Sequence, residues 1–277
     1  MRDKVVWAPD MATPPPSGRR GRPNAPPATL VLFVRHGRTP STGRVLPGRA
    51  PGLHLADDGK AQAEAVAERL ALWSLPDTAA KETGDPGPPA GGGPSPSGAA
   101  ASRRAPRGGG RDRAKKSGPR IRAVYTSPLE RTRETAAPIA RRLGLKVAVE
   151  RGLLECDFGE WTGAELKHLA KLPEWTTVQR YPSGFRFPGG ESFAGMWSRM
   201  ADTVVALCRR HPGEAIVAVS HADPIKAAVA DALGTHLDLF QRIVVSPCSV
   251  TAISYHTNGP VVLAVNSTGS LVELAPS

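Results

Sequence analysis

A continuous apolar run, Leu30–Val34, ends directly in Arg35 and His36. Five successive apolar residues bounded by chain breakers are typical of a strand that is buried on both faces of a parallel sheet. Two ionisable side chains at the end of such a strand are costly unless they meet solvent or a partner there. The run therefore predicts a buried β-strand and draws attention to the point at which that strand ends.

Apolar runs and helical patterns alternate along the rest of the chain. Helical spacing of apolar and Ala positions predicts helices over 57–73, 127–143, 191–211 and directly after His221. Apolar or alternating runs predict further strands over 121–126, 145–150, 215–220, 249–255 and 261–266. The last two strands are expected to form a hairpin around Asn258-Gly259. This alternation predicts an α/β fold, a three-layer α/β/α sandwich with a mostly parallel central sheet.

Two of these helices carry start signals, each with a proline next to the capping residue. Ser127 is expected to cap the helix of 127–143, and Glu130 would complete a capping box with it. Gly144 is expected to end the same helix. Asp223 is expected to cap the helix that follows His221. These signals place the amino ends of two helices next to the carboxyl ends of two strands.

Two segments differ sharply in composition from this pattern. Residues 76–120 contain 8 Pro and 10 Gly but no Ile, Leu, Val, Met, Phe, Trp or Tyr, and residues 1–28 are also rich in Pro and Arg. Such segments cannot bury enough apolar surface to offset the entropy lost on ordering. We therefore expect a disordered N-terminal arm over 1–28 and a single domain over 29–277 that is interrupted by a disordered insert at 76–120.

The formal net charge of +11 lies mostly in these two segments. Residues 1–28 contribute +3 and residues 76–120 contribute +5, which leaves only +3 for the rest of the chain. A strongly basic balance often indicates a nucleic-acid partner. Here it indicates at most weak, salt-dependent polyanion contact through the basic arms. The partner of the folded part has to be sought in its own polar residues.

Cysteine usage and hydropathy set further limits. The three cysteines, Cys156, Cys208 and Cys248, form no CxxC pair and show no spacing typical of a zinc site, so neither a metal nor another cofactor is expected. The N-terminus lacks the apolar core of a secretory signal, and no apolar run approaches the length of a membrane span. We expect a soluble, cytoplasmic protein. Its oligomeric state and the choice between Met1 and Met11 as its start stay open.

Polar side chains follow three of the predicted strands at the points where these strands end. The first strand is followed by Arg35 and His36, and Gly37 permits a sharp turn after them. The second strand leads to Arg131 and the fourth leads to His221. Ligands of open α/β sheets bind outside the carboxyl ends of the strands. Two arginines and two histidines are therefore expected to converge on one edge of the sheet.

This set of residues favours phosphoryl transfer. Arginines offer paired donors to phosphate oxygens, and a neutral imidazole is a competent nucleophile toward phosphorus. Neighbouring arginines should lower the pKa of His36 and keep its ring unprotonated near neutrality. The reaction also needs a proton donor for the leaving oxygen. The stretch LLECDFGEWTG offers three candidates, and spacing alone does not choose among Glu155, Asp157 and Glu160.

Four segments, VRHGRT, TSPLERTRETA, LLECDFGEWTG and VAVSHADPIKA, resemble in this order the motif set of the histidine phosphatase superfamily, which has the phosphoglycerate mutase-like fold. The resemblance covers residues 29–75 and 121–277. It implies that His36 is the residue that becomes phosphorylated and that Glu155 is the proton donor. It also implies that the rest of the phosphate pocket is formed by Arg35, Arg131 and His221.

The resemblance extends to the rim of the pocket. Thr39, within the family's RHGxT motif, is expected to line the pocket, and Ala222 is expected to contact the substrate. The chain departs from the family at two rim positions. It has Thr42 where the family often has Asn, and Ala222-Asp223 where many members have Gly. These differences bear on the identity of the substrate more than on the chemistry.

The sequence therefore predicts a histidine acid/base phosphatase, a metal-independent phosphomonoester hydrolase whose small-molecule substrate it does not identify. The nearest alternative is a phosphomutase of the phosphoglycerate mutase type, which the comparatively short segment 160–215 disfavours. A third alternative is an inactive anion-binding module with basic arms. The complete set of site residues argues against that reading.

Overall fold

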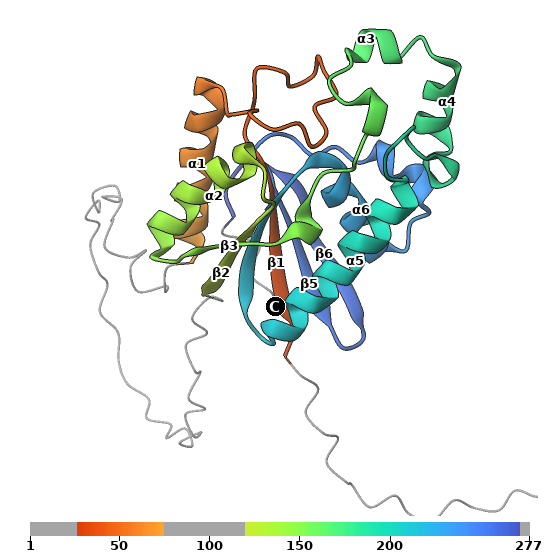
Figure 1. Ribbon diagram of the computed structural model, residues 1–277. Helices are drawn as coiled ribbons and strands as arrows, with labels where there is room; N and C mark the ends of the chain where they lie inside the picture. The colour runs from red at the N-terminus through yellow and green to blue at the C-terminus, as the bar shows by residue number, and fades with distance from the viewer. Residues whose placement is uncertain (1–26, 75–119, 272–277) are drawn as a thin grey trace, which may run out of the picture.

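The computed structural model describes residues 27–74 and 120–271 of the 277-residue chain. In this part of the chain a six-stranded sheet lies between two layers of helices (Figure 1). The expected arm at 1–28 and insert at 76–120 lie outside the described residues, apart from residues 27, 28 and 120. The described residues include every predicted strand and helix.

The sheet is mostly parallel, as the alternating pattern predicts. Its strands are β1 (Thr29–Arg35), β2 (Ile121–Thr126), β3 (Val147–Val149), β4 (Ala215–Ser220), β5 (Val250–His256) and β6 (Gly259–Ser267). They lie in the order β3-β2-β4-β1-β5-β6. The first four strands in this order are parallel, whereas β5 runs antiparallel to β1 and β6 antiparallel to β5. The predicted fold class and the closing hairpin are confirmed.

Four long helices cover the sheet, and shorter ones lie in the connection between β3 and α5 and after α6. The long helices are α1 (Asp57–Trp73), α2 (Glu130–Leu143), α5 (Phe193–Arg210) and α6 (Ala222–Leu233). The shorter ones are α3 (Leu166–Leu169), α4 (Pro173–Arg180) and the 3₁₀ turns η1 (Arg151–Leu153), η2 (Gly159–Trp161), η3 (Pro182–Gly184) and η4 (Leu237–Arg242). No helix in the described part of the chain is both long and apolar enough to cross a membrane.

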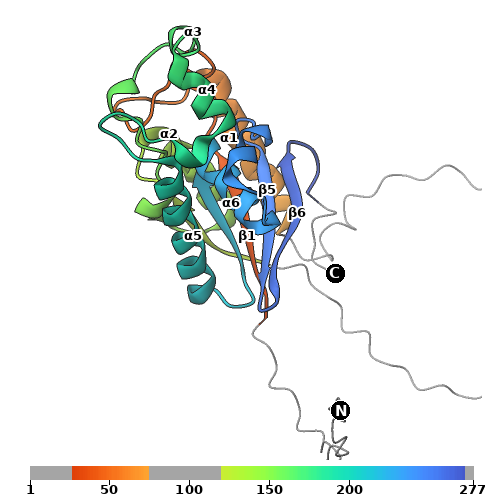
Figure 2. The same cartoon turned by 90° about the vertical axis from the view of Figure 1, so that its right-hand side faces the viewer.

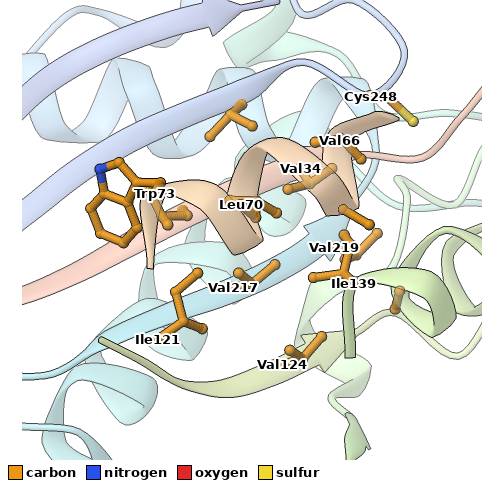
Figure 3. Packing of buried hydrophobic residues seen from close by; sticks show 14 of the residues in the cluster. Val34, Val66, Leu70, Trp73, Ile121, Val124, Ile139, Val217, Val219 and Cys248 are labelled. Carbon is orange, nitrogen blue, oxygen red and sulfur yellow. The ribbon is translucent and has the colours of Figure 1, made fainter. Parts of the chain in front are cut away.

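The apolar residues of β1 pack against the helices on both faces of the sheet, because successive side chains of a strand point to opposite faces. Val34 packs in a core with Leu70 of α1 and Ile139 of α2 (Figure 3). Leu32 belongs to the same core. Phe33, between them in sequence, packs on the other face against the core that includes residues of α5 and α6. A strand with helices on both faces needs a continuous apolar run rather than an alternating one.

A third apolar cluster lies beyond the carboxyl ends of the parallel strands, where Figures 1 and 2 place α3 and α4. It is largely aromatic: Trp161 stacks on Trp175 with ring centroids 6.3 Å apart and meets Phe185 and Phe187 at 5.5 Å. Cys156 is fully buried in the same cluster. Both Trp161 and Cys156 therefore contribute to the packing of this cluster.

Both predicted helix caps are wrong. α2 begins at Glu130 with Leu129 at the capping position, and no side chain caps it. The Ser127 hydroxyl bonds Nε2 of His221 at 2.9 Å instead. α6 begins at Ala222, so Asp223 lies inside its first turn, where its carboxylate pairs with Lys226 at 3.2 Å. Ser127 thus has a partner from another strand end, whereas Asp223 pairs with a residue one turn further along its own helix. The predicted stop at Gly144 is confirmed by its left-handed backbone at φ 66°.

The chain leaves the described part after α1 and returns to it just before β2. Ser74 follows α1, and its Oγ accepts a hydrogen bond from the backbone N–H of Ile121 at 3.2 Å. Ile121 is the first residue of β2, so this junction lies at the end of β2 away from Thr126. The two ends of the intervening segment are thus held together by the described residues themselves.

Candidate active site

Three neighbouring parallel strands deliver the predicted site residues to one edge of the sheet (Figure 1). The backbone N–H of His36 donates to Ser220 O at 3.0 Å, which joins the end of β1 to the end of β4. The backbone N–H of Ser127 donates to Val219 O at 3.0 Å, which joins the end of β2 to the same strand. The expected convergence at the carboxyl edge is therefore present.

The His36 ring is buried, with 5% of the residue exposed, and its two nitrogens have different partners. Nδ1 lies 2.7 Å from the carbonyl oxygen of Gly37, which only accepts, so Nδ1 carries the proton. Nε2 is then the acceptor, and it receives a hydrogen bond from Nε of Arg131 at 3.3 Å. Burial first, then the charges of Arg131 and Arg35, hold the pKa of His36 well below its usual range. The ring is neutral, with its lone pair at Nε2.

A close approach of two backbone segments fixes the turn after His36. A Cβ added at Gly37 would lie 2.5 Å from the carbonyl oxygen of Gly59 in α1. The N–H of Gly37 also donates to the hydroxyl of Thr135 in α2 at 3.1 Å. Glycine is therefore required here by the close approach to α1, and the backbone of Gly37 is not in the left-handed region.

The two arginines of the site each keep one buried donor without a partner among the described residues. Arg131 has no exposed surface and donates from Nη2 to Gly48 O at 2.7 Å. Arg35 donates from Nη1 to Val245 O at 2.7 Å. Nη1 of Arg131 and Nε of Arg35 are buried and have no hydrogen-bond partner among the described residues. Buried donors of this kind are costly unless an anion accepts from them.

His221 lies beside His36, with ring centroids 5.2 Å apart and the planes 63° to one another. Its Nε2 lies 2.9 Å from the Ser127 hydroxyl, and its buried Nδ1 has no partner among the described residues. Burial and then the charge of Arg131 hold the pKa of His221 well below its usual range. A second neutral imidazole is therefore available to donate to an oxygen bound between the two rings.

Glu155 is the carboxyl group that lies with the arginines. It follows η1 and has 8% of its surface exposed, and its Oε1 accepts from the N–H of Cys156 at 2.9 Å. Burial, helped by the nearby charge of Asp223, raises the pKa of Glu155 to about 7, although Arg131 and Arg35 oppose the shift. A carboxyl group with this pKa can both give and take a proton near neutrality.

The other two candidate acids have different surroundings. Asp157 is paired with Arg49 at 3.5 Å, and Glu160 is exposed in η2. Of the three acids that spacing left open, only Glu155 is buried in contact with the charges of Arg35 and Arg131. The geometry favours the position that the family resemblance implies.

The two expected rim residues lie beside the histidines in sequence. Thr39 is buried, and its Oγ1 lies 3.0 Å from Oγ1 of Thr42, whose hydroxyl also accepts from the Thr39 N–H at 2.9 Å. Thr42 thus closes a short turn with its hydroxyl. Ala222 is the first residue of α6, directly after His221. No polar contact of either residue with the two histidines is present among the described residues.

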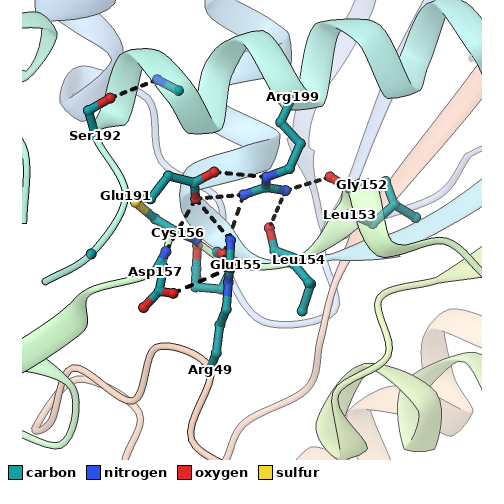
Figure 4. Close-up of polar contacts among 12 residues, drawn as sticks. Arg49, Gly152, Leu153, Leu154, Glu155, Cys156, Asp157, Glu191, Ser192 and Arg199 are labelled. Carbon is teal, nitrogen blue, oxygen red and sulfur yellow. Dashed lines mark hydrogen bonds and ion pairs between the residues drawn. The ribbon is translucent and has the colours of Figure 1, made fainter.

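Sequence reasoning missed a set of charged residues around the backbone of Glu155 (Figure 4). Arg199 on α5 and Glu191 before α5 form a paired contact, and Arg49 reaches both Glu191 and the carbonyl oxygen of Glu155. The guanidinium of Arg49 is thus occupied by protein partners. No local pattern indicates these contacts, because the residues are far apart in sequence.

Two neutral imidazoles, two buried guanidinium groups and one carboxyl group with a raised pKa define a site suited to binding and transferring a phosphoryl group. No group of three or more His, Cys, Asp or Glu side chains within residues 27–74 and 120–271 is arranged to hold a metal ion. The model of the histidine phosphatase superfamily (branch 1) matches residues 31–79 and 110–268, and the chain belongs to this family.

Several known proteins are similar to parts of this chain. Phosphoserine phosphatase 1 of Hydrogenobacter thermophilus is 31% identical over 160 residues, which cover 54% of this chain and 72% of that protein. The bifunctional protein Rv2228c of Mycobacterium tuberculosis is 33% identical over 153 residues, 54% of this chain but only 42% of that protein. Family membership together with phosphatase relatives supports phosphatase activity.

Solved structures share the fold over most of the chain. Mycobacterial glucosyl-3-phosphoglycerate phosphatase Rv2419c has a TM-score of 0.64 at 21% identity, covering 87% of this chain and all of that one. Phosphoserine phosphatase from Entamoeba histolytica also has a TM-score of 0.64 at 21% identity, covering 87% of this chain and 98% of that one. At this level of identity the likeness concerns the fold.

Proposed function

We propose that the protein hydrolyses small phosphomonoesters without a metal ion, through a phosphohistidine on His36 and with Glu155 as proton donor. The observation that carries the proposal is the contact of His36 Nε2 with Arg131, which requires a neutral ring with its lone pair inside the phosphate pocket. A nucleophile that is already neutral needs no base to activate it.

In the first half of the reaction, Nε2 of His36 attacks phosphorus and the bond from phosphorus to the ester oxygen breaks. Glu155 gives its proton to the departing oxygen and becomes a carboxylate. In the second half, water attacks the phosphohistidine while Glu155 takes a proton from that water. Phosphate leaves, and the nitrogen–phosphorus bond electrons return to His36. A pKa near 7 suits Glu155 to both directions of proton transfer.

The remaining site residues would hold the transferring group. At this site Arg131 Nη1, Arg35 Nε and His221 Nδ1 are buried and have no hydrogen-bond partner among the described residues, and phosphoryl oxygens would accept from them. Charge builds on those oxygens during transfer, so these contacts are stronger in the transition state than with the bound ester. Thr39 and Ala222 would line the substrate side of the pocket.

The relatives narrow the class of substrate. One similar protein is called a phosphoserine phosphatase and a structural neighbour a glucosyl-3-phosphoglycerate phosphatase. We infer that this chain acts on a compact phosphomonoester of a hydroxylated metabolite. The sequence-based expectation of cytoplasmic location and weak polyanion contact through the arms is retained as part of this proposal.

The first test is hydrolysis of p-nitrophenyl phosphate in the presence of a chelator by the wild-type protein and by His36→Ala. Activity that survives the chelator and is lost in the variant supports the proposal. A phosphoryl group trapped on wild-type protein by rapid denaturation and mapped to another residue would overturn it. Conversion of 3-phosphoglycerate to 2-phosphoglycerate faster than phosphate release would favour the mutase alternative.

An inactive protein would favour the anion-binding alternative. Deletion of residues 1–28 and 76–120 distinguishes anion binding by the basic arms from hydrolysis by the folded part. Polyanion binding should be lost with the arms, while phosphatase activity should remain. Activity that disappears with the deletion would show that these segments belong to the catalytic unit.

A further inference from the structure

The backbone around Glu155 is held by charged side chains that take no part in the proposed chemistry. We propose that Arg199 and Glu191 are positioning residues that orient Glu155 for proton transfer, and that Arg49 links this pair to the phosphate pocket. The inference rests on the proposed role of Glu155 as proton donor. It assigns a function in the reaction to three residues outside the pocket.

Arg199 binds the turn that carries Glu155 through three carbonyl oxygens. Its Nη1 donates to Gly152 O at 2.6 Å and to Leu154 O at 3.0 Å, and its Nη2 lies 3.4 Å from Glu155 O (Figure 4). Carbonyl oxygens of Glu155 and of the residue before it are thus fixed by one rigid, planar group. Lysine, with a single nitrogen, cannot reproduce this fork.

Glu191 fixes the orientation of Arg199 in turn. Its two carboxylate oxygens accept from Nε and Nη2 of Arg199 at 3.0 and 2.9 Å. Oε2 also accepts from the N–H of Asp157 at 3.3 Å, two residues beyond Glu155. The side chains of Arg199 and Glu191 are only 22% and 19% exposed. A paired, mostly buried contact of this kind is stronger and more directional than a surface ion pair.

We call the Arg199–Glu191 pair the clamp. Arg49 connects the clamp to Arg131, the arginine proposed to bind phosphate. Its Nε donates to Glu155 O at 2.9 Å and its Nη2 to Glu191 at 2.9 Å. The preceding residue, Gly48, accepts from Nη2 of Arg131 at 2.7 Å. Two adjacent residues therefore join the backbone of the proton donor to the arginine that contacts His36. The contacts of Gly48 and Arg49 thus hold the nucleophile His36 and the acid Glu155 at a fixed distance from each other.

The need for such a clamp follows from how little else holds Glu155. Its carboxyl group makes one hydrogen bond in the described structure, from the N–H of Cys156. The direction of the side chain therefore depends on the position of its backbone. A proton donor must lie within hydrogen-bond reach of the leaving oxygen, and a displacement of about 1 Å can cost about 10²-fold in rate.

A purely structural role would look different in the kinetics. Loss of folded protein lowers the rate for every substrate by the same factor. Loss of acid positioning lowers it most for substrates with a basic leaving group, because a good leaving group departs with little help from a proton. Phenyl phosphate and p-nitrophenyl phosphate share the same aryl phosphate core but differ in leaving-group basicity, so the ratio of their kcat/KM values separates the two roles.

The test compares Arg199→Lys and Glu191→Gln with the control Arg209→Lys in the full chain. Arg209 lies in the last turn of the same helix, α5, and is exposed. We expect Arg199→Lys to lower kcat/KM for phenyl phosphate by about 10²-fold and for p-nitrophenyl phosphate by a much smaller factor. Glu191→Gln should act in the same direction. The control should change neither value nor their ratio.

Glu155→Gln, which lacks the proposed proton donor, is the reference variant. Combined with Arg199→Lys, it should show no further loss, because the clamp acts through the missing acid. An unchanged substrate ratio in folded Arg199→Lys and Glu191→Gln, with a changed ratio in Glu155→Gln, would overturn the positioning role alone. An unchanged ratio in Glu155→Gln itself would overturn the proton-donor assignment and the clamp with it.

Discussion

Arg131 and His36 meet through a hydrogen bond from a guanidinium Nε to an imidazole Nε2, 3.3 Å long. The direction of this bond excludes a proton on Nε2, because two donors would then face each other. The same arginine has a buried Nη1 without a partner among the described residues. Arg131 thus keeps the ring neutral and offers a donor to the group that the ring would attack.

Replacing Arg131 should remove both effects. We expect Arg131→Lys to lower kcat/KM for p-nitrophenyl phosphate by about 10²- to 10³-fold, the range seen when one transition-state donor is lost. Steady-state kinetics on folded protein measure the effect. Arg133→Lys, an exposed position on the same helix, is the matched control. A loss shared equally by both variants would contradict a specific role for Arg131.

The pH dependence of kcat/KM should fall as pH rises through about 7, because Glu155 must be protonated to act as an acid. Asp223 raises the pKa of Glu155 by the repulsion of its negative charge. Asp223→Asn removes that charge, so the pKa should fall and the loss of activity should begin at lower pH. Asp231→Asn, an exposed carboxylate later on α6, should leave the profile unchanged. A basic limb that stays in place in Asp223→Asn would disprove the coupling.

Glu155 should also make folding stability depend on pH. Its pKa is raised from 4.5 to about 7 in the folded protein, so the folded state holds this proton more tightly than the unfolded state. The stability linked to that proton is present below pH 4.5 and is lost as pH rises through about 7. Glu155→Gln should therefore gain stability over the wild type between pH 5 and pH 9, by about 3 kcal/mol.

Thermal unfolding at several pH values measures this difference. Glu160→Gln is the matched control, because Glu160 lies five residues further on and is exposed. Parallel stability curves for wild type and Glu155→Gln would show that the carboxyl group is not destabilised by burial.

The turn after His36 should tolerate no side chain. In Gly37→Ala the new methyl group would lie 2.5 Å from Gly59 O, so α1 or the turn has to move. We expect a loss of about 1–3 kcal/mol in the free energy of unfolding, the usual cost of overpacking, and a fall in kcat as His36 shifts. Gly269→Ala, with no atom within 4 Å of the added Cβ, is the control. Wild-type stability in Gly37→Ala would contradict the packing argument.

The strands and the residues at their ends were predictable because both depend on local sequence. A buried parallel strand needs a continuous apolar run, and Arg35, His36 and His221 follow such runs directly. The predicted 57–73 helix agrees with α1 in both its ends. A few neighbouring residues thus determine the end of each strand, and the parallel sheet brings these ends together.

The helix caps and the Arg199–Glu191 contacts were not predictable, because they depend on the folded structure around them and not on local sequence alone. Ser127 and Asp223 have side chains that fit a helix cap, but Ser127 meets the tertiary partner His221 instead. α6 begins earlier than expected, so Asp223 lies inside the helix and pairs with Lys226 one turn further along it. Arg199 sits in a helical pattern that reads equally well as a solvated face. Its function depends on Glu155, which is 44 residues away. Spacing along the chain carries no information about such contacts.

The hydrogen bond between Ser74 and Ile121 also has a practical meaning for engineering. Ser74 and Ile121 already lie together, so a segment inserted between them has to close a loop. The free-energy cost of closing that loop grows only with the logarithm of its length, by about 0.6 kcal/mol per doubling. The junction lies at the start of β2, whereas the catalytic edge begins after Thr126. This position is therefore a suitable insertion site. A fluorescent reporter, an affinity tag or a short turn can replace the connection between α1 and β2 without contact with the catalytic residues.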